Sequence, residues 1–185
     1  MRIALVSPYD LSVPGGVQSQ VLGLADALVH LGHTVAVIAP GRPGTWSVPG
    51  AKSTAVGRSL RVPVNGSYAP VAPSLFAMRR TARAVADFAP GVVHIHEPLV
   101  PGPALAALIG ANVPVVATFH RARSSRVYTA YARVSRRFVR RVGTVIAVSG
   151  TAAQTLRAVI GDIDVAIVAN AVATDRLARL QPARR

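Results

Sequence analysis

Short runs of β-branched and apolar residues recur along the chain, and stretches with helical spacing separate them. The runs cover residues 2–7, 34–39, 92–96, 115–119, 144–148 and 164–168. Strands that are apolar at nearly every position are typical of a sheet buried on both faces, and parallel strands need crossover helices between them. The pattern predicts an α/β fold with a doubly wound, mainly parallel sheet and helices on both faces.

Helical periodicity is clearest between the first two runs, where apolar residues of 17–31 share one face and Gly32 stands at a position suited to end a helix. Residues 74–88 and 125–142 predict two basic amphipathic helices, and 175–180 predict a short one. On the first basic helix the predicted apolar face holds Leu75, Met78, Ala82 and Val85. Residues 40–73 are rich in proline and glycine and predict loops with short edge strands.

The composition limits both the chemistry and the partners of the chain. None of the 185 residues is cysteine, which excludes thiol chemistry and fits a reducing compartment, and no apolar run approaches a signal or membrane-spanning segment. We therefore expect a cytoplasmic protein. The net charge of +14 favours polyanionic partners, namely nucleic acid, anionic lipid or phosphorylated substrates. Nucleic acid ranks last because no nucleic-acid-binding motif accompanies the arginines.

A glycine pair lies between the first strand and the first helix, within Pro14-Gly15-Gly16-Val17-Gln18. In doubly wound sheets ligands bind at this position, where free backbone N–H groups and the helix dipole favour an anion such as phosphate. The segment matches neither the dinucleotide-binding nor the P-loop pattern, so nicotinamide and ATP gain no support. The two glycines are also compatible with nothing more than a tight turn.

Three histidines fall on two predicted strands. His94 and His96 alternate along one strand and so share a face, with Glu97 directly after them, and His120 ends the next strand. A structural or acceptor-lining role is favoured over zinc for the first two, since no further ligand stands at a recognisable spacing. His120 is the leading candidate for a site residue, with a structural hydrogen bond as the alternative.

Hydrolase chemistry is disfavoured. The sequence has no Gly-x-Ser-x-Gly elbow. Glu97 is its single glutamate, so no convincing carboxylate pair for glycoside hydrolysis is present.

Four passages together resemble glycosyltransferase family 4. They are residues 1–9 running into 13–19, then Val92-Val93-His94-Ile95-His96-Glu97-Pro98, Ala117-Thr118-Phe119-His120 and Val145-Ile146-Ala147-Val148-Ser149. The first passage, with Asn65-Gly66-Ser67, is especially similar to actinobacterial phosphatidylinositol mannosyltransferases. The resemblance implies a Rossmann-like domain over residues 1–172, the N-terminal half of a GT-B fold, with 173–185 as a tail or the start of an interdomain linker.

The resemblance also implies transfer of a hexose with retention of anomeric configuration. The expected co-substrate is the sugar nucleotide GDP-mannose, which would supply mannose, and the expected acceptor is phosphatidylinositol or a related acceptor. By analogy Gly15 and Gly16 would meet the donor diphosphate, and His120 would contact the transferred sugar as the catalytic residue. The residues that would place the acceptor are Tyr9, Gln18, Asn65, Gly66 and Ser67. No tightly bound cofactor and no protein-held metal are expected, while a divalent metal with the sugar nucleotide stays open.

The membrane surface would be the basic helix at 74–88, with Arg79, Arg80 and Arg83 against anionic lipid, so the expected location is cytoplasmic and peripheral on the inner face of the plasma membrane. A solvated helix face is the alternative for the second basic helix.

Two departures from the family pattern stand out. Ala169-Asn170-Ala171-Val172-Ala173 replaces the family's Pro-Asn-Gly-Val-Asp, and Pro70 stands where an acceptor-loop arginine is usual. The sugar-nucleotide domain of the family is not expected within this length, so transfer by this polypeptide alone is expected to be negligible. The alternatives are an inactive domain that binds phospholipid or carbohydrate, and half of an enzyme with a soluble acceptor.

Overall fold

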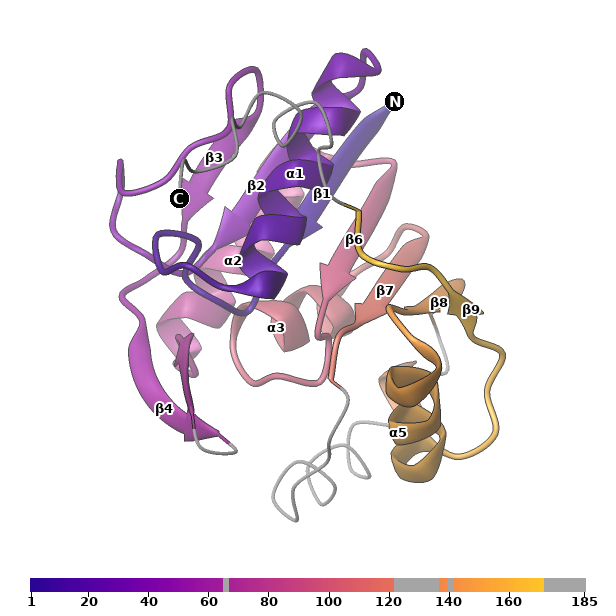
Figure 1. The fold of residues 1–185 in the computed structure, drawn as a ribbon. Coiled ribbons are helices and arrows are strands. Elements are labelled where there is room, and N and C mark those ends of the chain that lie inside the picture. The colour runs from indigo at the N-terminus through magenta and orange to yellow at the C-terminus, as the bar shows by residue number, and fades with distance from the viewer. Residues whose placement is uncertain (65–66, 122–136, 140–141, 172–185) are drawn as a thin grey trace, which may run out of the picture.

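The computed structural model describes residues 1–64, 67–121, 137–139 and 142–171 (Figure 1). Within them, seven strands form one sheet in the order β3-β2-β1-β6-β7-β8-β9, and every neighbouring pair is parallel. These strands are β1 (Arg2–Val6), β2 (Thr34–Ala39), β3 (Lys52–Ala55), β6 (Val92–His96), β7 (Val115–Phe119), β8 (Thr144–Ala147) and β9 (Ala166–Ile167). The predicted α/β fold with a mainly parallel sheet is confirmed.

Helices cover both faces of the sheet because the strand order grows in opposite directions from β1. Right-handed crossovers then place the connecting helices on opposite sides. Helix α1 (Gly16–His30) packs on one face, where Ile3, Leu5, Val35 and Val37 meet Val21 and Ala25. The other face carries α2 (Leu75–Phe88), α3 (Pro103–Gly110) and α5 (Gly150–Ile160), and its core includes Ala4, Val6, Val93, Ile95, Ala117 and Phe119.

The sequence pattern did not single out α3 and α5. Helix α3 is apolar on all sides and has five buried residues, so it carries no amphipathic signal. Helix α5 begins after Ser149, whose hydroxyl accepts the main-chain N–H of Ala152 as an N-cap. Most of the predicted basic helix at 125–142 and all of the predicted helix at 175–180 lie outside the described residues.

The predicted apolar face of α2 is partly wrong. Leu75 is 71% exposed, whereas the buried side chains are Ala77, Thr81 and Phe88. Small residues at positions 77 and 81 allow α2 to approach its neighbours closely. The buried hydroxyl of Thr81 donates a hydrogen bond to the Ala77 carbonyl at 2.8 Å. The exposed face of α2 therefore combines Leu75 and Phe76 with arginines.

The proline- and glycine-rich segment contains the expected edge strand, β3, and also a separate antiparallel hairpin of β4 (Leu60–Val64) and β5 (Ser67–Val71). The hairpin joins the sheet through a bridge between Tyr9 and Val71 and a 2.9 Å bond from the Asp10 N–H to the Pro70 carbonyl. These contacts place it beside the end of β1.

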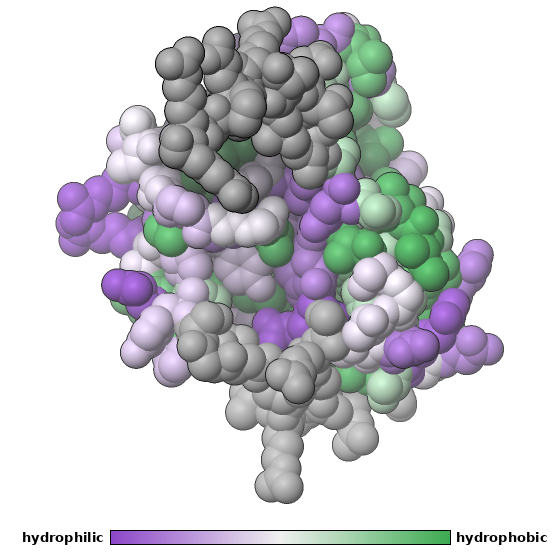
Figure 2. Space-filling model, in the orientation of Figure 1, coloured by the Kyte–Doolittle hydropathy of each residue, from purple (hydrophilic) through white to green (hydrophobic). Residues whose placement is uncertain are grey.

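The last described residues return from β9 to α1. The Gln20 side-chain amide bonds the main chain of Ala171 in both directions, at 2.5 Å to its carbonyl and 3.1 Å from its N–H. Apolar surface gathers on the side of the molecule where β8 and β9 lie (Figure 2), and Ile167 and Val168 are exposed there. No helix within the described part of the chain is long and apolar enough to cross a membrane.

Candidate functional site

The carboxyl ends of β1, β6 and β7 bring the candidate residues to one edge of the sheet. Parallel register pairs Leu5 with His94 and His96 with Thr118, so the segments that follow these strands emerge side by side. Tyr9 follows β1, Glu97 follows β6 and His120 follows β7. This is the edge at which doubly wound sheets bind their ligands.

The start of α1 opens onto the same edge. No side chain caps it, so the N–H groups of its first turn have no side-chain acceptor, and no acidic residue lies in that turn. Apart from its chain neighbours and its own helix backbone, a methyl group on Gly16 would meet no atom of the described residues within 4 Å, which leaves space for a group to approach the main chain. This end of the helix can accept an anion through free N–H groups and the helix dipole.

Gly15 has a different role from Gly16. A Cβ at Gly15 would lie 2.4 Å from Oε1 of Gln18, whose side chain is 7% exposed. The absence of a side chain at position 15 therefore allows Gln18 to fold back over the loop. Gly15 and Gln18 act as packing partners here, and the open approach to the main chain is at Gly16.

The three histidines of the two strands form a continuous stack. The rings of His94 and His96 lie 4.6 Å apart at 16°, and those of His96 and His120 lie 5.3 Å apart at 23°. Nε2 of His94 is 2.7 Å from the Thr118 hydroxyl, and Nδ1 of His96 is 3.0 Å from Nε2 of His120. The leading candidate His120 thus belongs to a hydrogen-bonded cluster.

Burial keeps these imidazoles neutral. Desolvation lowers the pKa of His94 to about 4, with a smaller contribution from His120, and desolvation lowers the pKa of His120 to about 4. The pKa of His96 falls well below its usual value for the same reason, helped by both neighbouring histidines. At neutral pH the cluster can donate and accept hydrogen bonds but carries no charge.

Glu97 is the buried acid of the site. It is 1% exposed, its Oε1 accepts the main-chain N–H of His120 at 2.6 Å, and it adopts a φ of 47°, which costs a non-glycine residue backbone energy. Desolvation raises the pKa of Glu97, and the His120 N–H and the charge of Arg121 oppose that rise. Desolvation, with Glu97 nearby, also raises the pKa of Tyr9, while Arg121 counteracts it. Tyr9 therefore stays a neutral phenol.

Asp10 is a functional candidate that the sequence reasoning missed. Its carboxylate accepts the N–H and the hydroxyl of Ser12 at 3.0 and 2.7 Å, and the hydroxyl of Ser59 at 2.7 Å. It thereby ties the loop after β1 to the start of the hairpin. Its position four residues beyond the buried strand β1 was the available signal.

The remaining predicted residues lie elsewhere. Asn65 and Gly66 fall outside the described residues, and Ser67 is placed only as the first residue of β5. Arg79, Arg80 and Arg83 are exposed on α2, on the sheet face opposite α1. Among the described residues no group of three or more histidine, aspartate or glutamate side chains could hold a metal ion.

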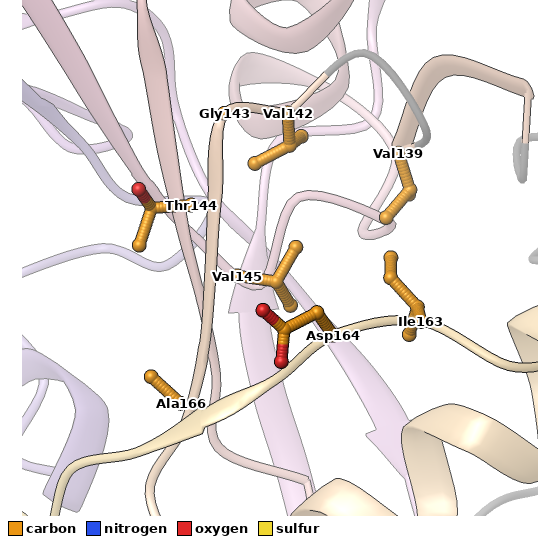
Figure 3. A pocket seen from close by; sticks show the side chains of 8 residues that line it. All are labelled: Val139, Val142, Gly143, Thr144, Val145, Ile163, Asp164 and Ala166. Carbon is orange, nitrogen blue, oxygen red and sulfur yellow. The ribbon is translucent and has the colours of Figure 1, made fainter.

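Two cavities lie away from this edge. One, of about 320 Å³, is at the amino ends of β8 and β9, where Val139, Val145 and Ile163 turn toward one another and the Asp164 carboxylate lies to one side, next to Val145 (Figure 3). The other lies between α2 and α3. Neither of these two cavities borders α1 or the histidine cluster.

The family model for Glycosyltransferase Family 4 matches residues 14–176. The fold and this match show that the chain belongs to Glycosyltransferase Family 4.

Curated relatives indicate which members of the family this chain resembles. The chain is 40% identical over 164 residues to a phosphatidyl-myo-inositol mannosyltransferase of Propionibacterium freudenreichii subsp. shermanii, a match that covers 83% of this chain and 42% of the relative. It is 35% identical over 183 residues to the enzyme of the same name from Mycobacterium tuberculosis, covering 96% of this chain and 47% of the relative. The chain thus spans less than half the length of these relatives.

Solved structures agree on the fold. A glycosyltransferase from Rickettsia africae aligns with a TM-score of 0.62 at 20% identity, covering 98% of this chain and 46% of that one. A sucrose-phosphate synthase from Thermosynechococcus elongatus aligns with a TM-score of 0.63 at 16% identity, covering 91% and 47%. At these identities the likeness establishes a GT-B-type fold alone.

Because the histidines of the cluster are neutral in the folded chain, we expect the fold to be less stable in acid. The unfolded chain binds protons on His94 and His120 below about pH 6.5, whereas the folded chain does so only near pH 4. The free energy of unfolding should therefore be highest above that window and fall as the pH drops, by up to about 1.4 kcal/mol per pH unit for each imidazole. Urea denaturation across the window measures this slope.

Glu97 contributes with the opposite sign, because a raised pKa makes the folded state hold a proton that the unfolded state releases. The histidines outnumber it, so the net slope keeps their sign. His120→Gln should flatten the slope. A free energy of unfolding that stays constant or rises as the pH falls would show that the histidines are not held neutral by the fold.

Proposed function

We propose that this chain is the acceptor-side half of a retaining mannosyltransferase that transfers mannose from GDP-mannose to phosphatidylinositol or a closely related lipid. The observation that carries the proposal is the pairing of an uncapped α1 amino end, open at Gly16, with the neutral cluster around His120 at the same edge of the sheet. The names of the relatives supply the sugar and the acceptor class.

The donor diphosphate would bind at the start of α1. The main chain at Gly16 is unobstructed, and the first turn offers N–H groups that no side chain occupies. A diphosphate there would be stabilised by the helix dipole and would leave with its charge already compensated. Gly15 supports this geometry indirectly through Gln18.

The transferred sugar and the acceptor would lie between α1, the histidine cluster and the hairpin. His120 and Tyr9 are uncharged donors on a preorganised scaffold, suited to hydroxyl groups and to an oxocarbenium-like sugar, and this picture requires no covalent nucleophile. Asn65, Gly66 and Ser67, of which only Ser67 lies within the described residues, would contact the acceptor. Arg61 lies directly across the hairpin from Pro70, and its guanidinium would replace the arginine that the family has near that position.

A second domain would complete the cleft. The relatives extend well beyond the length that this chain covers, and a sugar-nucleotide domain would occupy part of that length. The edge of the sheet that carries α1 and the histidine cluster would form one wall of the cleft and the second domain the other. We expect the base and most of the diphosphate contacts to come from that second wall, so residues 1–185 by themselves would transfer mannose negligibly.

The membrane-facing surface would be the exposed face of α2 with the adjoining hairpin. Arg80 lies over the Phe76 ring at 5.5 Å, and Arg61 lies over the Tyr68 ring at 5.1 Å. Leu60, Tyr68, Leu75 and Phe76 are each more than 60% exposed. Arginine beside exposed aromatic and aliphatic side chains is the composition expected of a surface that enters the headgroup region of an anionic bilayer.

A transfer assay tests the proposed reaction. Residues 1–171 of this chain, fused to the C-terminal half of the Propionibacterium relative, should produce mannosylated phosphatidylinositol from GDP-mannose, and the chain alone should not. Replacing His120 with alanine in the fusion should lower kcat by about 10²–10³, the usual cost of removing one preorganised donor. A fusion that binds both substrates but transfers to a soluble inositol phosphate in preference to the lipid would favour the soluble-acceptor alternative.

Gly16→Ala in the same fusion tests whether the donor diphosphate binds at the start of α1. Beyond its own helix backbone and chain neighbours, the added methyl meets no atom of the described residues, so the free energy of unfolding should change by less than about 1 kcal/mol. The KM for GDP-mannose should nevertheless rise, because the methyl occupies the approach to the main chain. An unchanged KM would place the diphosphate elsewhere.

Liposome co-sedimentation of the unfused chain tests the membrane surface. Binding should be salt-sensitive on phosphatidylinositol vesicles and weak on phosphatidylcholine vesicles. Because each arginine near an anionic bilayer contributes about 1 kcal/mol, the Arg79/Arg80/Arg83→Ala variant should bind roughly a hundred-fold more weakly. Arg157→Ala on α5 is the matched control and should bind like the unchanged chain.

Phosphatidylglycerol vesicles of equal charge separate headgroup recognition from charge alone. Stronger binding to the inositol lipid supports an acceptor site, whereas equal binding to both anionic lipids supports only a charged surface. Absence of binding to every anionic vesicle would remove the membrane part of the proposal.

A further inference from the structure

The Asp10 carboxylate links two segments that are far apart in sequence. Its Oδ1 accepts the main-chain N–H of Ser12 at 3.0 Å and the Ser12 hydroxyl at 2.7 Å. Its Oδ2 accepts the hydroxyl of Ser59 at 2.7 Å, and Ser59 directly precedes strand β4 of the hairpin. One oxygen therefore holds the loop after β1, and the other holds the hairpin across 49 residues of sequence.

The main chain of Asp10 holds the same two segments. Its N–H donates to the carbonyl of Pro70 in strand β5 at 2.9 Å, and its carbonyl accepts the N–H of Val13 at 3.3 Å. The side chain thus contacts the residue before the first strand of the hairpin, while the main chain contacts the second strand. Both strands of the hairpin are fixed to the loop after β1 through this one residue.

The surroundings of Asp10 leave its carboxylate little freedom. Asp10 is 6% exposed, and none of the ion pairs between described residues includes it. A Cβ on Gly41 would lie 2.7 Å from Nε1 of Trp46 and 3.0 Å from Oδ1 of Asp10, so the chain after β2 packs against the carboxylate because a glycine stands there. Hydroxyl and N–H donors alone stabilise the buried charge, and removing one of them leaves that charge less well satisfied.

The two linked segments have different tasks in the proposed function. From Ser12 the loop continues through Pro14 to Gly15 and Gly16 at the start of α1, where the donor diphosphate would bind. The hairpin includes Ser67, which would contact the acceptor. Transfer requires the two substrates to be aligned, and a misplacement of about 1 Å can lower a rate by about 10²-fold. The link between loop and hairpin therefore affects the step in which donor and acceptor must meet.

We propose that Asp10 is a positioning residue for the transfer reaction: its carboxylate fixes the hairpin, which would contact the acceptor, relative to the loop that leads to the donor end of α1. Asp10 is buried among its partners and acts through them, without touching either substrate. The effect on transfer rests on the proposed function, whereas the restraint on the hairpin is a property of the chain by itself.

Hydrogen exchange in the unfused chain tests the restraint without substrate. Ser59→Ala and Ser12→Ala are a matched pair, because each removes one 2.7 Å hydroxyl bond to the same carboxylate but only Ser59 connects it to the hairpin. In Ser59→Ala the Asp10 N–H, which bonds Pro70, should exchange about tenfold faster, the usual effect of losing one hydrogen bond to a charged group. In Ser12→Ala its exchange should stay unchanged. Faster exchange in both variants, or in neither, would overturn the proposal.

The transfer assay of the fusion separates positioning from stability. Asp10→Ala should lower kcat by about 10²-fold, while the KM values for GDP-mannose and for the lipid change much less, because each substrate still binds its own segment. Ser59→Ala should lower kcat in the same direction, and Ser12→Ala should not. Asp10→Asn keeps an oxygen for Ser12 and offers an N–H to the Ser59 hydroxyl oxygen, so it should restore most of kcat.

A change in the free energy of unfolding with kcat of the folded enzyme unaltered would show a structural role alone and would contradict the proposal. If Asp10→Ala does not fold, Ser59→Ala and Asp10→Asn still decide the outcome. A fusion with the unchanged sequence that fails to transfer, in a chain that shows the expected contrast in hydrogen exchange, would count against the proposed function and not against the restraint.

Discussion

The parallel pairing of β1, β6 and β7 is the constraint on which the candidate site depends. Because Leu5 pairs with His94 and His96 pairs with Thr118, the three strands end together and deliver Tyr9, Glu97 and His120 to one edge. Side chains alternate between faces along a strand, so a slip of one residue would turn His96 toward α3 and break the histidine stack. The buried apolar residues that alternate with the histidines along β6, Val93 and Ile95, prevent that slip.

The polar cluster is held together at a cost to stability. A buried glutamate with positive φ, three neutral imidazoles and several unpaired buried polar atoms would each be removed by selection for stability alone. Their concentration where β6 and β7 end, beside the uncapped α1, is the reason to regard the cluster as a candidate site rather than as a structural hydrogen-bond network. The surrounding strands are almost fully buried, and the burial of their apolar side chains stabilises the fold enough to offset this cost.

Much of this architecture could be predicted from the sequence. The apolar runs identified six strands of the sheet, because strands buried on both faces have an unmistakable composition, and the helix after Gly16 followed from its periodicity. Helix α3 was missed because an all-apolar segment has no face to detect, and the apolar face of α2 was misplaced because Ala77 and Thr81 pack more closely than Leu75. For such small residues, tertiary packing decides the orientation of the helix.

The site was less accessible to sequence reasoning. His120 and Gly16 were found because they stand at strand and helix ends, but the links between His96, His120 and Glu97 need the register of two strands far apart in sequence. Asp10 was overlooked because one acidic residue after a strand has no pattern of its own. The distinct roles of Gly15 and Gly16 depend on the fold of the Gln18 side chain, which no local sequence rule specifies.

The central claim is that the ligand-binding edge lies between α1 and the histidine cluster. Titration of the nitrogen-15-labelled chain with myo-inositol 1-phosphate, followed by amide NMR, tests it most directly. The account predicts that the largest shifts fall on the amides of Gly16, Val17 and His120. Shifts confined to Val145 and Asp164, at the cavity on the opposite edge, or no shift at any amide, would contradict it.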